Sequence, residues 1–345
     1  MKIFKKIIAW AMLSLILQIS GLFVLDNFVF QHTSEFESKK IEVEKTSIKD
    51  INATIPTDAE SINISYDGKY LTYYLDDSLY IEDTKTGTKN KVETENNGTI
   101  LYYKWLSERN RLIIAEKIKK DGEDKIQLLT YNPKDSTETY VTDICKYENN
   151  MEVKKISASV LTGVYYVDIH KGGVKSTVYR IDRNNEITTV KIEANVLGNM
   201  EVIPHADRLV YEDELNNKFF VTSPNKKLNF NTNKNLTLIG IDREDIVYMG
   251  ELNGEKIVSI TYGKVDDEPS TWTTVQLESA VNRKNIYFND SSEILVNDDL
   301  QGCVTNVTTG KKLEYEGKLI QIKEEFIATM DNDGRLSYKS LNDDK

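Results

Sequence analysis

The chain is poor in cysteine, proline and net positive charge, and each shortage excludes a class of protein. Two cysteines in 345 residues cannot form a disulfide scaffold or a cysteine-rich metal site. Five prolines and 17 glycines exclude collagen-like and proline-rich chains. Because 55 acidic residues outnumber 44 basic ones, the net charge is −11, which argues against a nucleic-acid binder with a basic face. The length allows one large domain or two ordinary ones.

The sequence motifs of common enzymes are also missing. No Gly-x-Ser-x-Gly nucleophile elbow occurs. Neither a Gly-x-Gly-x-x-Gly turn nor a Gly-x-x-x-x-Gly-Lys-Ser/Thr loop is present, so the common nucleotide sites are unsupported. We therefore name no catalytic, cofactor-binding or metal-binding residue, predict no cofactor, and favour a protein that is not an enzyme.

The three histidines lack the close spacings of metal-binding motifs. His32, His170 and His205 lie far apart in the sequence. A metal pair formed by His170 and His205 across two repeats is an alternative to ordinary surface histidines. The segment Asp331–Gly334 resembles part of a calcium loop, but the EF-hand pattern fails around it, so we expect a hairpin turn there.

Paired aspartates and the two cysteines are expected to be structural. Asp76-Asp77, Asp266-Asp267 and Asp298-Asp299 are predicted to be solvated loop charges, although one pair could face a central channel and bind a cation. Cys145 and Cys303 lie in distant repeats, so we expect two unpaired and mostly buried thiols.

Tyrosine is abundant and occurs in adjacent pairs. Nineteen tyrosines include the pairs Tyr73-Tyr74, Tyr102-Tyr103 and Tyr165-Tyr166. Neighbouring residues of a strand face opposite sides, so one ring of each pair should pack inside the protein. The other ring could line a binding surface, with glycan stacking in a cell-surface protein as the alternative, but strand propensity and packing between blades are favoured.

Only the first thirty residues contain a long apolar run. Ile7 to Leu25 carry no charge, and nineteen helical residues span about 28 Å, close to the thickness of a bilayer core. Basic residues precede the run and acidic residues follow it, which places the N-terminus in the cytoplasm and the rest outside it. The basic residues are Lys2, Lys5 and Lys6, and the acidic ones Asp26, Glu35 and Glu37.

The same run is longer than the core of most cleaved signal peptides. Leu22 to Phe30 offers no small-x-small cleavage site, and no cysteine follows for a lipid anchor. We therefore predict a single transmembrane helix in residues 1–30 that contacts the membrane through residues 7–25, while occasional cleavage stays open. Residues 31–55 are predicted to be a linker, and residues 56–345 an extracytoplasmic domain.

The remainder of the chain is predicted to form short strands that recur in a degenerate repeat. Runs rich in Val, Ile, Thr and Tyr are bounded by Asp, Asn, Gly and Lys. The second strand of each unit is the clearest marker, and its occurrences are about 43 residues apart, as in propeller repeats. The markers lie at or near Leu71, Leu112, Tyr165, Leu209, Ile246, Ile294 and Ile327.

These units predict an all-β fold, a β-propeller. Seven blades are favoured, with six or eight as alternatives, and an irregular β-sandwich or two small β domains as the competing folds. The last unit is one strand short, and the alternating segment Ile41 to Ile48 could supply that strand and close the ring.

One repeat resembles a known family. Ser65 to Gly87 (SYDGKYLTYYLDDSLYIEDTKTG) resembles the repeat of TolB-like, or PD40, propellers, which are WD40-like. Their Asp-Gly-Lys turn, strand-ending Asp and Thr-Gly turn are matched, while Tyr66 replaces the usual proline. The matching residues are Asp67, Gly68, Lys69, Asp83, Thr86 and Gly87. The resemblance implies a propeller with protein partners, although the separate N-terminal domain of TolB has no counterpart here.

Together these features predict a bacterial cell-membrane protein whose exported propeller is a binding or scaffold module. The composition, rich in Lys, Asn and Ile, is typical of AT-rich bacteria. We expect the propeller to bind another cell-envelope protein, a peptide or a glycan, and no nucleic acid. The alternative is an enzyme of the lyase or cyclotransferase type, with its site in the propeller channel and an extracellular substrate. In a third interpretation the helix is the functional part of the protein and the propeller is an assembly platform.

Overall fold

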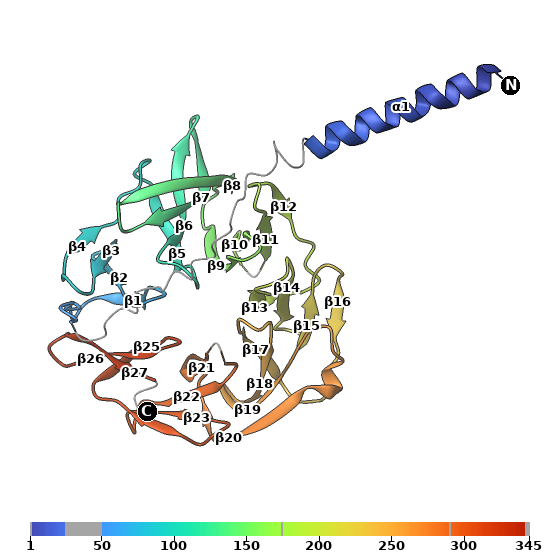
Figure 1. The fold of residues 1–345 in the computed structure, drawn as a ribbon. Coiled ribbons are helices and arrows are strands. Elements are labelled where there is room, and N and C mark those ends of the chain that lie inside the picture. Colours follow the sequence, from blue (N-terminus) through green and yellow to red (C-terminus); the bar gives the residue numbers. More distant parts are fainter. Residues whose placement is uncertain (1, 25–49, 174, 290, 342–345) are drawn as a thin grey trace. The chain divides into compact units, whose positions relative to one another are not determined.

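The computed structural model describes residues 2–24, 50–173, 175–289 and 291–341 (Figure 1). The chain divides into two units, Met1–Lys45 and Thr46–Lys345, and each is described by itself. The first unit contains one helix, and the described part of the second is almost entirely β-structure.

Helix α1 (Lys2–Val24) contains residues 7–24 of the apolar run, and Leu25 lies outside the described residues. Its segment Ile3–Val24 is long and apolar enough to cross a membrane, and none of it is buried against protein. Large apolar side chains such as Trp10 and Leu17 are about 70% exposed. By length and composition, this helix has the properties of a membrane anchor or a signal sequence.

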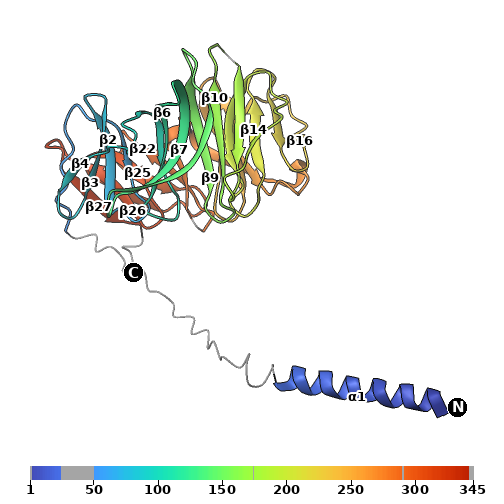
Figure 2. The same cartoon turned by 90° about the horizontal axis from the view of Figure 1, so that it is seen from above.

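The second unit is a seven-bladed β-propeller in its described residues. Each blade is an antiparallel meander whose first strand lies nearest the centre of the wheel and whose last strand lies at the rim (Figures 1 and 2). Blades 1 to 3 contain β1 (Glu60–Ile64), β2 (Tyr70–Leu75), β3 (Ser78–Asp83) and β4 (Lys89–Lys91); β5 (Thr99–Trp105), β6 (Leu112–Lys120), β7 (Glu123–Asn132) and β8 (Thr137–Lys146); β9 (Glu152–Ser159), β10 (Val164–His170), β11 (Ser176–Ile181) and β12 (Ile187–Thr189).

The other four blades repeat the pattern, with two short 3-10 helices beside β20. Blades 4 to 7 contain β13 (Leu197–Val202), β14 (Leu209–Asp213), β15 (Lys218–Val221) and β16 (Lys226–Leu228); β17 (Leu236–Ile241), β18 (Val247–Asn253), β19 (Lys256–Gly263), η2 (Pro269–Thr271) and β20 (Thr273–Val281); η3 (Arg283–Asn285), β21 (Ile286–Phe288), β22 (Ile294–Asp298), β23 (Cys303–Asn306) and β24 (Lys312–Glu314); β25 (Lys318–Ile322), β26 (Phe326–Met330) and β27 (Leu336–Ser340). The predicted fold class and the favoured blade number are thereby confirmed.

The seventh blade has three strands of its own, as expected, and its outer edge is covered by the segment before blade 1. Thr54 forms a β-bridge with Arg335. The Ile55 amide donates to the Gly334 carbonyl at 2.8 Å, and the Leu336 amide donates to the Ala53 carbonyl at 3.1 Å. Residues 53–55, directly before blade 1, therefore close the ring in the described residues. The predicted closing strand, 41–48, lies outside the described residues.

The hydrophobic core is divided among the spaces between blades. Seven clusters of buried side chains occur in the described residues, one for each pair of neighbouring blades. This division explains the tyrosine pairs. Tyr73 packs between blades 7 and 1, whereas Tyr74 packs between blades 1 and 2. Tyr165 and Tyr166 likewise enter the clusters on opposite faces of blade 3. Both rings of these pairs therefore serve packing.

The residues shared with the TolB-like repeat form turns. Gly68 has a φ of +78°, and the Asp67 carboxylate accepts the Lys69 amide at 2.8 Å. Asp83 accepts the Lys85 and Thr86 amides in the same way. Because these side chains and backbone conformations define tight turns, the motif specifies fold rather than a ligand.

A second copy of the Asp83 turn occurs in blade 6. There Asn306 accepts the amides of Thr308 and Thr309, and Gly310 has a φ of +70°. The Gly310 amide donates a hydrogen bond to the Asn306 carbonyl at 2.8 Å, and the Gly87 amide donates to the Asp83 carbonyl at the same distance. The weak sequence repeat is therefore a geometric repeat.

Candidate functional site

The histidines considered as metal ligands have separate carboxylate partners. His170 Nε2 lies 3.4 Å from Asp168 within blade 3. His205 Nδ1 lies 3.1 Å from Asp245, which belongs to blade 5. Within residues 2–24, 50–173, 175–289 and 291–341, no three His, Cys, Asp or Glu side chains gather as a metal site. His32 lies outside the described residues.

The predicted loop acids occupy turns. Asp76 and Asp77 both have positive φ, as a tight hairpin turn requires. Asp266 forms an ion pair with Arg208, with 2.8 Å between Arg208 Nη1 and Asp266 Oδ1. Asp331 accepts two amides of the β26–β27 turn, which confirms the hairpin expected there. The sequence alternative of a calcium loop gains no support from this arrangement.

Both cysteines are free, as predicted. Cys303 is buried in blade 6, and Cys145 is half-buried in blade 2. Burial raises the pKa of the Cys145 thiol, which opposes formation of the reactive thiolate. Cys145 therefore lacks the environment of an activated nucleophile.

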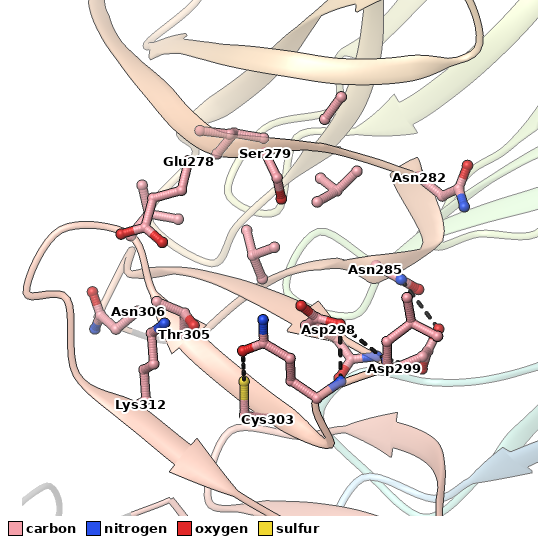
Figure 3. A pocket seen from close by; sticks show the side chains of 18 of the residues that line it. Glu278, Ser279, Asn282, Asn285, Asp298, Asp299, Cys303, Thr305, Asn306 and Lys312 are labelled. Carbon is pink, nitrogen blue, oxygen red and sulfur yellow. Dashed lines mark hydrogen bonds between the residues drawn. The ribbon is translucent and has the colours of Figure 1, made fainter.

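The first candidate site is a groove of 580 Å³ at the rim, between blades 5 and 6 (Figure 3). The outer strand β20 forms one wall, and the outer strands of blade 6 form the other. Glu278 and Ser279 on β20 lie on one side of the groove, and Thr305 and Lys312 lie on the other (Figure 3). Leu277, Val296 and other apolar side chains also line it.

Hydrogen bonds fix the inner end of this rim groove. Asp299 accepts Asn297 Nδ2 at 2.7 Å and Asn285 Nδ2 at 3.2 Å. Asp298 accepts the Leu300 and Gln301 amides of the β22–β23 turn. The pair Asp298-Asp299, a candidate for a channel-facing cation site, therefore lies in the rim groove.

Strand β20 is the feature of the rim groove best suited to binding. It is the last strand of its sheet and pairs only with β19 among the described strands. Most of its nine residues are exposed. An exposed strand edge presents a row of main-chain donors and acceptors, which an extended peptide can pair with.

The second candidate site lies around the propeller axis, where charged side chains from several blades meet. Lys155 on β9 donates to Glu201 on β13 at 2.5 Å, and Ser157 donates to the same carboxylate at 2.8 Å. Burial opposes ionisation of Glu201, yet the nearby lysine charges lower its pKa to about 2. Glu201 is therefore ionised at neutral pH.

Three further cations complete this group, which we call the axial cluster: Lys104, Lys155, Glu201, Arg283 and Lys323. Lys104 is on β5, and Lys323 directly follows β25. Arg283, in η3, donates to the Ile239 carbonyl of blade 5 at 2.8 Å. Burial and the Lys104 charge lower the pKa of Lys323 to about 8, although Glu324 raises it.

An ion-pair cluster centred on Arg243 joins blades at one end of the inner strands. Arg243 donates to both carboxylate oxygens of Glu324 at 3.1 Å. Its other amino group lies 3.7 Å from Glu108, and its guanidinium carbon lies 6.0 Å from the Tyr66 ring centroid. The turns of blades 1, 2, 5 and 7 therefore meet at this arginine.

Sequence reasoning missed both the axial cluster and the Arg243 contacts. Each blade contributes one or two of these residues, so they form no linear motif. The available signal was a charged residue at or beside the end of an inner strand, as at Lys104 and Lys323.

Two comparisons at the level of sequence found no match. No described protein family and no curated protein matches the chain. Solved structures with a similar fold include a chain of the Mitotic Checkpoint Complex, with a TM-score of 0.53 and 12% identity over 85% of this chain and 90% of that chain. Another is one of two prolyl endopeptidases, with a TM-score of 0.54 and 15% identity over 82% of this chain and 47% of that chain.

A third similar structure is the β-propeller domain of Cps50 (Swd1) from Myceliophteria thermophila. Its TM-score is 0.52, with 10% identity over 84% of this chain and 99% of that domain. At such identities the likeness shows the fold alone. The chain thus combines one long apolar N-terminal helix with a seven-bladed β-propeller that has WD40-like structural neighbours.

Proposed function

We propose that this chain is a membrane-anchored binding or scaffold protein of the bacterial cell envelope. Helix α1 anchors it, and the propeller is displayed outside the cytoplasm. The exposure of Ile3–Val24 and its bilayer length support the anchor. Lys2, Lys5 and Lys6 at the start of the helix support a cytoplasmic N-terminus.

The proposed organisation has three parts: an anchor in residues 1–30, a linker in 31–55 and the propeller in 56–345. The contacts of Ala53, Thr54 and Ile55 with blade 7 support a ring-closing role for the end of the linker. The paired Asx turns of blades 1 and 6 support a place among TolB-like propellers, because they extend the family's turn geometry beyond its best-matching repeat.

We locate binding at the rim groove, and the observation that carries this assignment is the exposed edge of β20 beside it. An extended segment of another envelope protein can pair with β20 while its side chains enter the groove. Apolar contacts with Leu277 and Val296 would supply burial, and Glu278 and Lys312 would select the register.

Site-specific photo-crosslinking in cells that produce the full chain tests this assignment. A photoreactive residue at Ser279, which is exposed on β20, should capture a discrete partner. The matched control is Thr139, which is exposed on β8, the outer strand of blade 2. Equal capture from both positions, or none from Ser279, would contradict binding at the rim groove.

Membrane topology is tested separately. The full chain should remain in the membrane fraction after alkaline carbonate washing, and added protease should digest the propeller on cells stripped of their wall. Release by carbonate would contradict the anchor, and protection from external protease would contradict the orientation.

The second candidate function, a channel enzyme of the lyase or cyclotransferase type, is favoured by the Arg243 contacts. Arginine and glutamate side chains gathered at a channel mouth are groups that such enzymes use for charge stabilisation and proton transfer. Both Glu108 and Glu324 are, however, paired with Arg243. Turnover of an extracellular substrate that is lost in Glu324→Gln, with crosslinking at Ser279 intact, would establish this alternative.

A further inference from the structure

Blade 3 carries a cluster of polar side chains beside the turn that joins β10 and β11. In the strand pairing, His170 lies directly opposite Ser176 of β11 and Glu152 of β9. Asp168 is two positions away on the same strand as His170, so the four side chains share one face of the blade. Opposite residues of an antiparallel pair have Cβ atoms about 4.5–5.5 Å apart. Two carboxylates, an imidazole and a hydroxyl are therefore neighbours on this face.

Asp168 and His170 approach each other without the spacing of an ordinary hydrogen bond. Asp168 Oδ2 and His170 Nε2 are 3.4 Å apart, beyond the range of about 2.7–3.2 Å for an N–H···O bond. Two ligands of one tetrahedral zinc ion are about 3.3–3.4 Å apart, because each bond to the metal is about 2.0–2.1 Å long. The two side chains therefore have the spacing that a shared metal ion requires.

Two other oxygen atoms of this cluster have no partner. Asp168 Oδ1 and Ser176 Oγ are buried and make no hydrogen bond with any residue that the structure describes. Burial raises the pKa of Asp168 and the nearby Ser176 hydroxyl lowers it, yet no hydrogen bond joins the two residues. Asp168 is only 4% exposed, so water does not compensate its carboxylate. Such a buried group is unfavourable unless a cation or a proton compensates it.

Glu152 can supply a third ligand and a second negative charge. It pairs with Lys154 at 2.7 Å, and both side chains of this pair are exposed. Because an exposed ion pair is weak, Glu152 can turn towards His170 at little cost while Lys154 moves into water. The two carboxylates, Asp168 and Glu152, then balance the charge of a divalent ion, and a neutral imidazole completes the ligand set.

We propose that Asp168 and His170, with Glu152 as the third ligand, bind a divalent transition-metal ion of the zinc type. Imidazole together with carboxylate suits such an ion, whereas magnesium and calcium prefer oxygen ligands alone. Three protein ligands leave a fourth position for water, and the unpaired Ser176 hydroxyl can bind that water. The His170 side chain is 18% exposed, so the ion can enter from solvent. This site lies in blade 3 and is independent of the rim groove.

Metal titration of the full chain in detergent micelles tests the proposal. Zn²⁺ should raise the thermal unfolding midpoint in a saturable way, whereas Mg²⁺ at the same concentrations should not. Co²⁺, used as a spectroscopic probe in place of Zn²⁺, should give the visible ligand-field bands of a bound tetrahedral ion. A midpoint that moves no more with Zn²⁺ than with Mg²⁺ would overturn the proposal.

A second histidine–aspartate pair provides the matched control. His170→Ala should weaken Zn²⁺ binding at least about tenfold, because even changes next to metal ligands commonly cost 10–100-fold. His205 Nδ1 lies 3.1 Å from Asp245 Oδ1, within hydrogen-bond range, and 54% of the His205 side chain is exposed. His205→Ala should therefore leave the Zn²⁺ response unchanged. Equal responses of the two variants would show that the ion binds elsewhere and would overturn the site.

Variants of the two carboxylates separate binding from folding. Asp168→Asn should lose the Co²⁺ bands, yet without metal it should be at least as stable as the wild type, because it removes a buried charge. A less stable metal-free variant would show instead that neighbouring side chains satisfy this carboxylate. Thermal unfolding curves recorded without metal establish that each variant is folded.

Glu152→Gln tests the third ligand at an exposed position where folding is not at risk. It should weaken Zn²⁺ binding about tenfold. Glu255→Gln, at an exposed position between β18 and β19, should have no effect. An unchanged Zn²⁺ affinity in Glu152→Gln would overturn the three-ligand arrangement.

Discussion

Replacement of Gly68 by alanine tests the seam at which the propeller ring closes. Gly68 lies in the Asp67-Gly68 turn with a φ of +78°. A Cβ atom there would meet Phe326 Cζ at 2.8 Å and Tyr338 Cε2 at 2.9 Å. These rings cannot retreat easily, since their centroids are 4.4 Å apart and Tyr338 Oη donates to the Gly68 carbonyl at 2.7 Å.

Two costs add at this position. The left-handed backbone costs alanine about 1–2 kcal/mol relative to glycine. Overpacking against the two rings adds about 1–3 kcal/mol. Gly122→Ala is the matched control, because the Asp121-Gly122 turn has a φ of +81° and no described atom lies within 4 Å of the added Cβ. The control should therefore show the backbone cost alone.

Thermal unfolding of the full chain, followed by circular dichroism and tryptophan fluorescence, measures the difference. Both variants should be less stable than the wild type, and Gly68→Ala should be lower than Gly122→Ala by several degrees, since about 1 kcal/mol corresponds to 2–4 °C in large domains. Equal losses would show that the contact between blades 1 and 7 carries no packing cost. A larger loss in Gly122→Ala would refute the reasoning entirely.

Three further variants probe buried groups. Burial raises the pKa of Glu116, and its Oε2 has no hydrogen-bond partner among the described residues, so the free energy of unfolding should fall as pH rises from about 4.5 through the raised pKa. Glu116→Gln should therefore be more stable than the wild type by about 1 kcal/mol in urea unfolding at pH 8, and equally stable near pH 4. An equal gain at both pH values would contradict this sign. Tyr166 donates to Asp207 across blades 3 and 4 at 2.7 Å, so Tyr166→Phe should cost about 1.5–3 kcal/mol in urea unfolding, and an unchanged midpoint would exclude that role. Ile55 is 1% exposed at the ring closure, so Ile55→Ala should cost about 2–5 kcal/mol and speed proteolysis at the seam; wild-type proteolysis would argue against closure by this segment.

The blades could be predicted from the sequence because their signals are local. Asp67-Gly68 marks a turn, Tyr70–Leu75 follows as a strand, and the same order recurs along the chain. Such signals depend only on backbone conformation and on side-chain alternation. They also show that the last blade lacks a strand.

The closing contact was harder to locate because its sequence is irregular. The described closure uses Ala53 to Ile55, which make a single β-bridge and two flanking hydrogen bonds rather than a regular strand. The more regular 41–48 segment was the stronger candidate by alternation. Pairing between the two ends of a chain depends on tertiary geometry, which alternation does not encode.

The axial cluster could not be predicted because its parts share no local pattern. Lys104 is predictable as a strand residue, and Lys323 as the first residue of a turn. Their common neighbourhood depends on the number of blades and on the depth of each residue along its inner strand. Both quantities emerge only when the ring is complete.

Closure by the two ends of the chain also governs how the protein can be made. Tyr338 and Gly68 are 270 positions apart, so their bond must wait until the last blade has been synthesised. Earlier blades can stack in order as they emerge, but Ala53, Ile55 and Leu71 keep an apolar face uncovered until the last blade arrives. A nascent chain in that condition is prone to aggregate, which makes a chaperone, or rapid docking of the final hairpin, important for its yield.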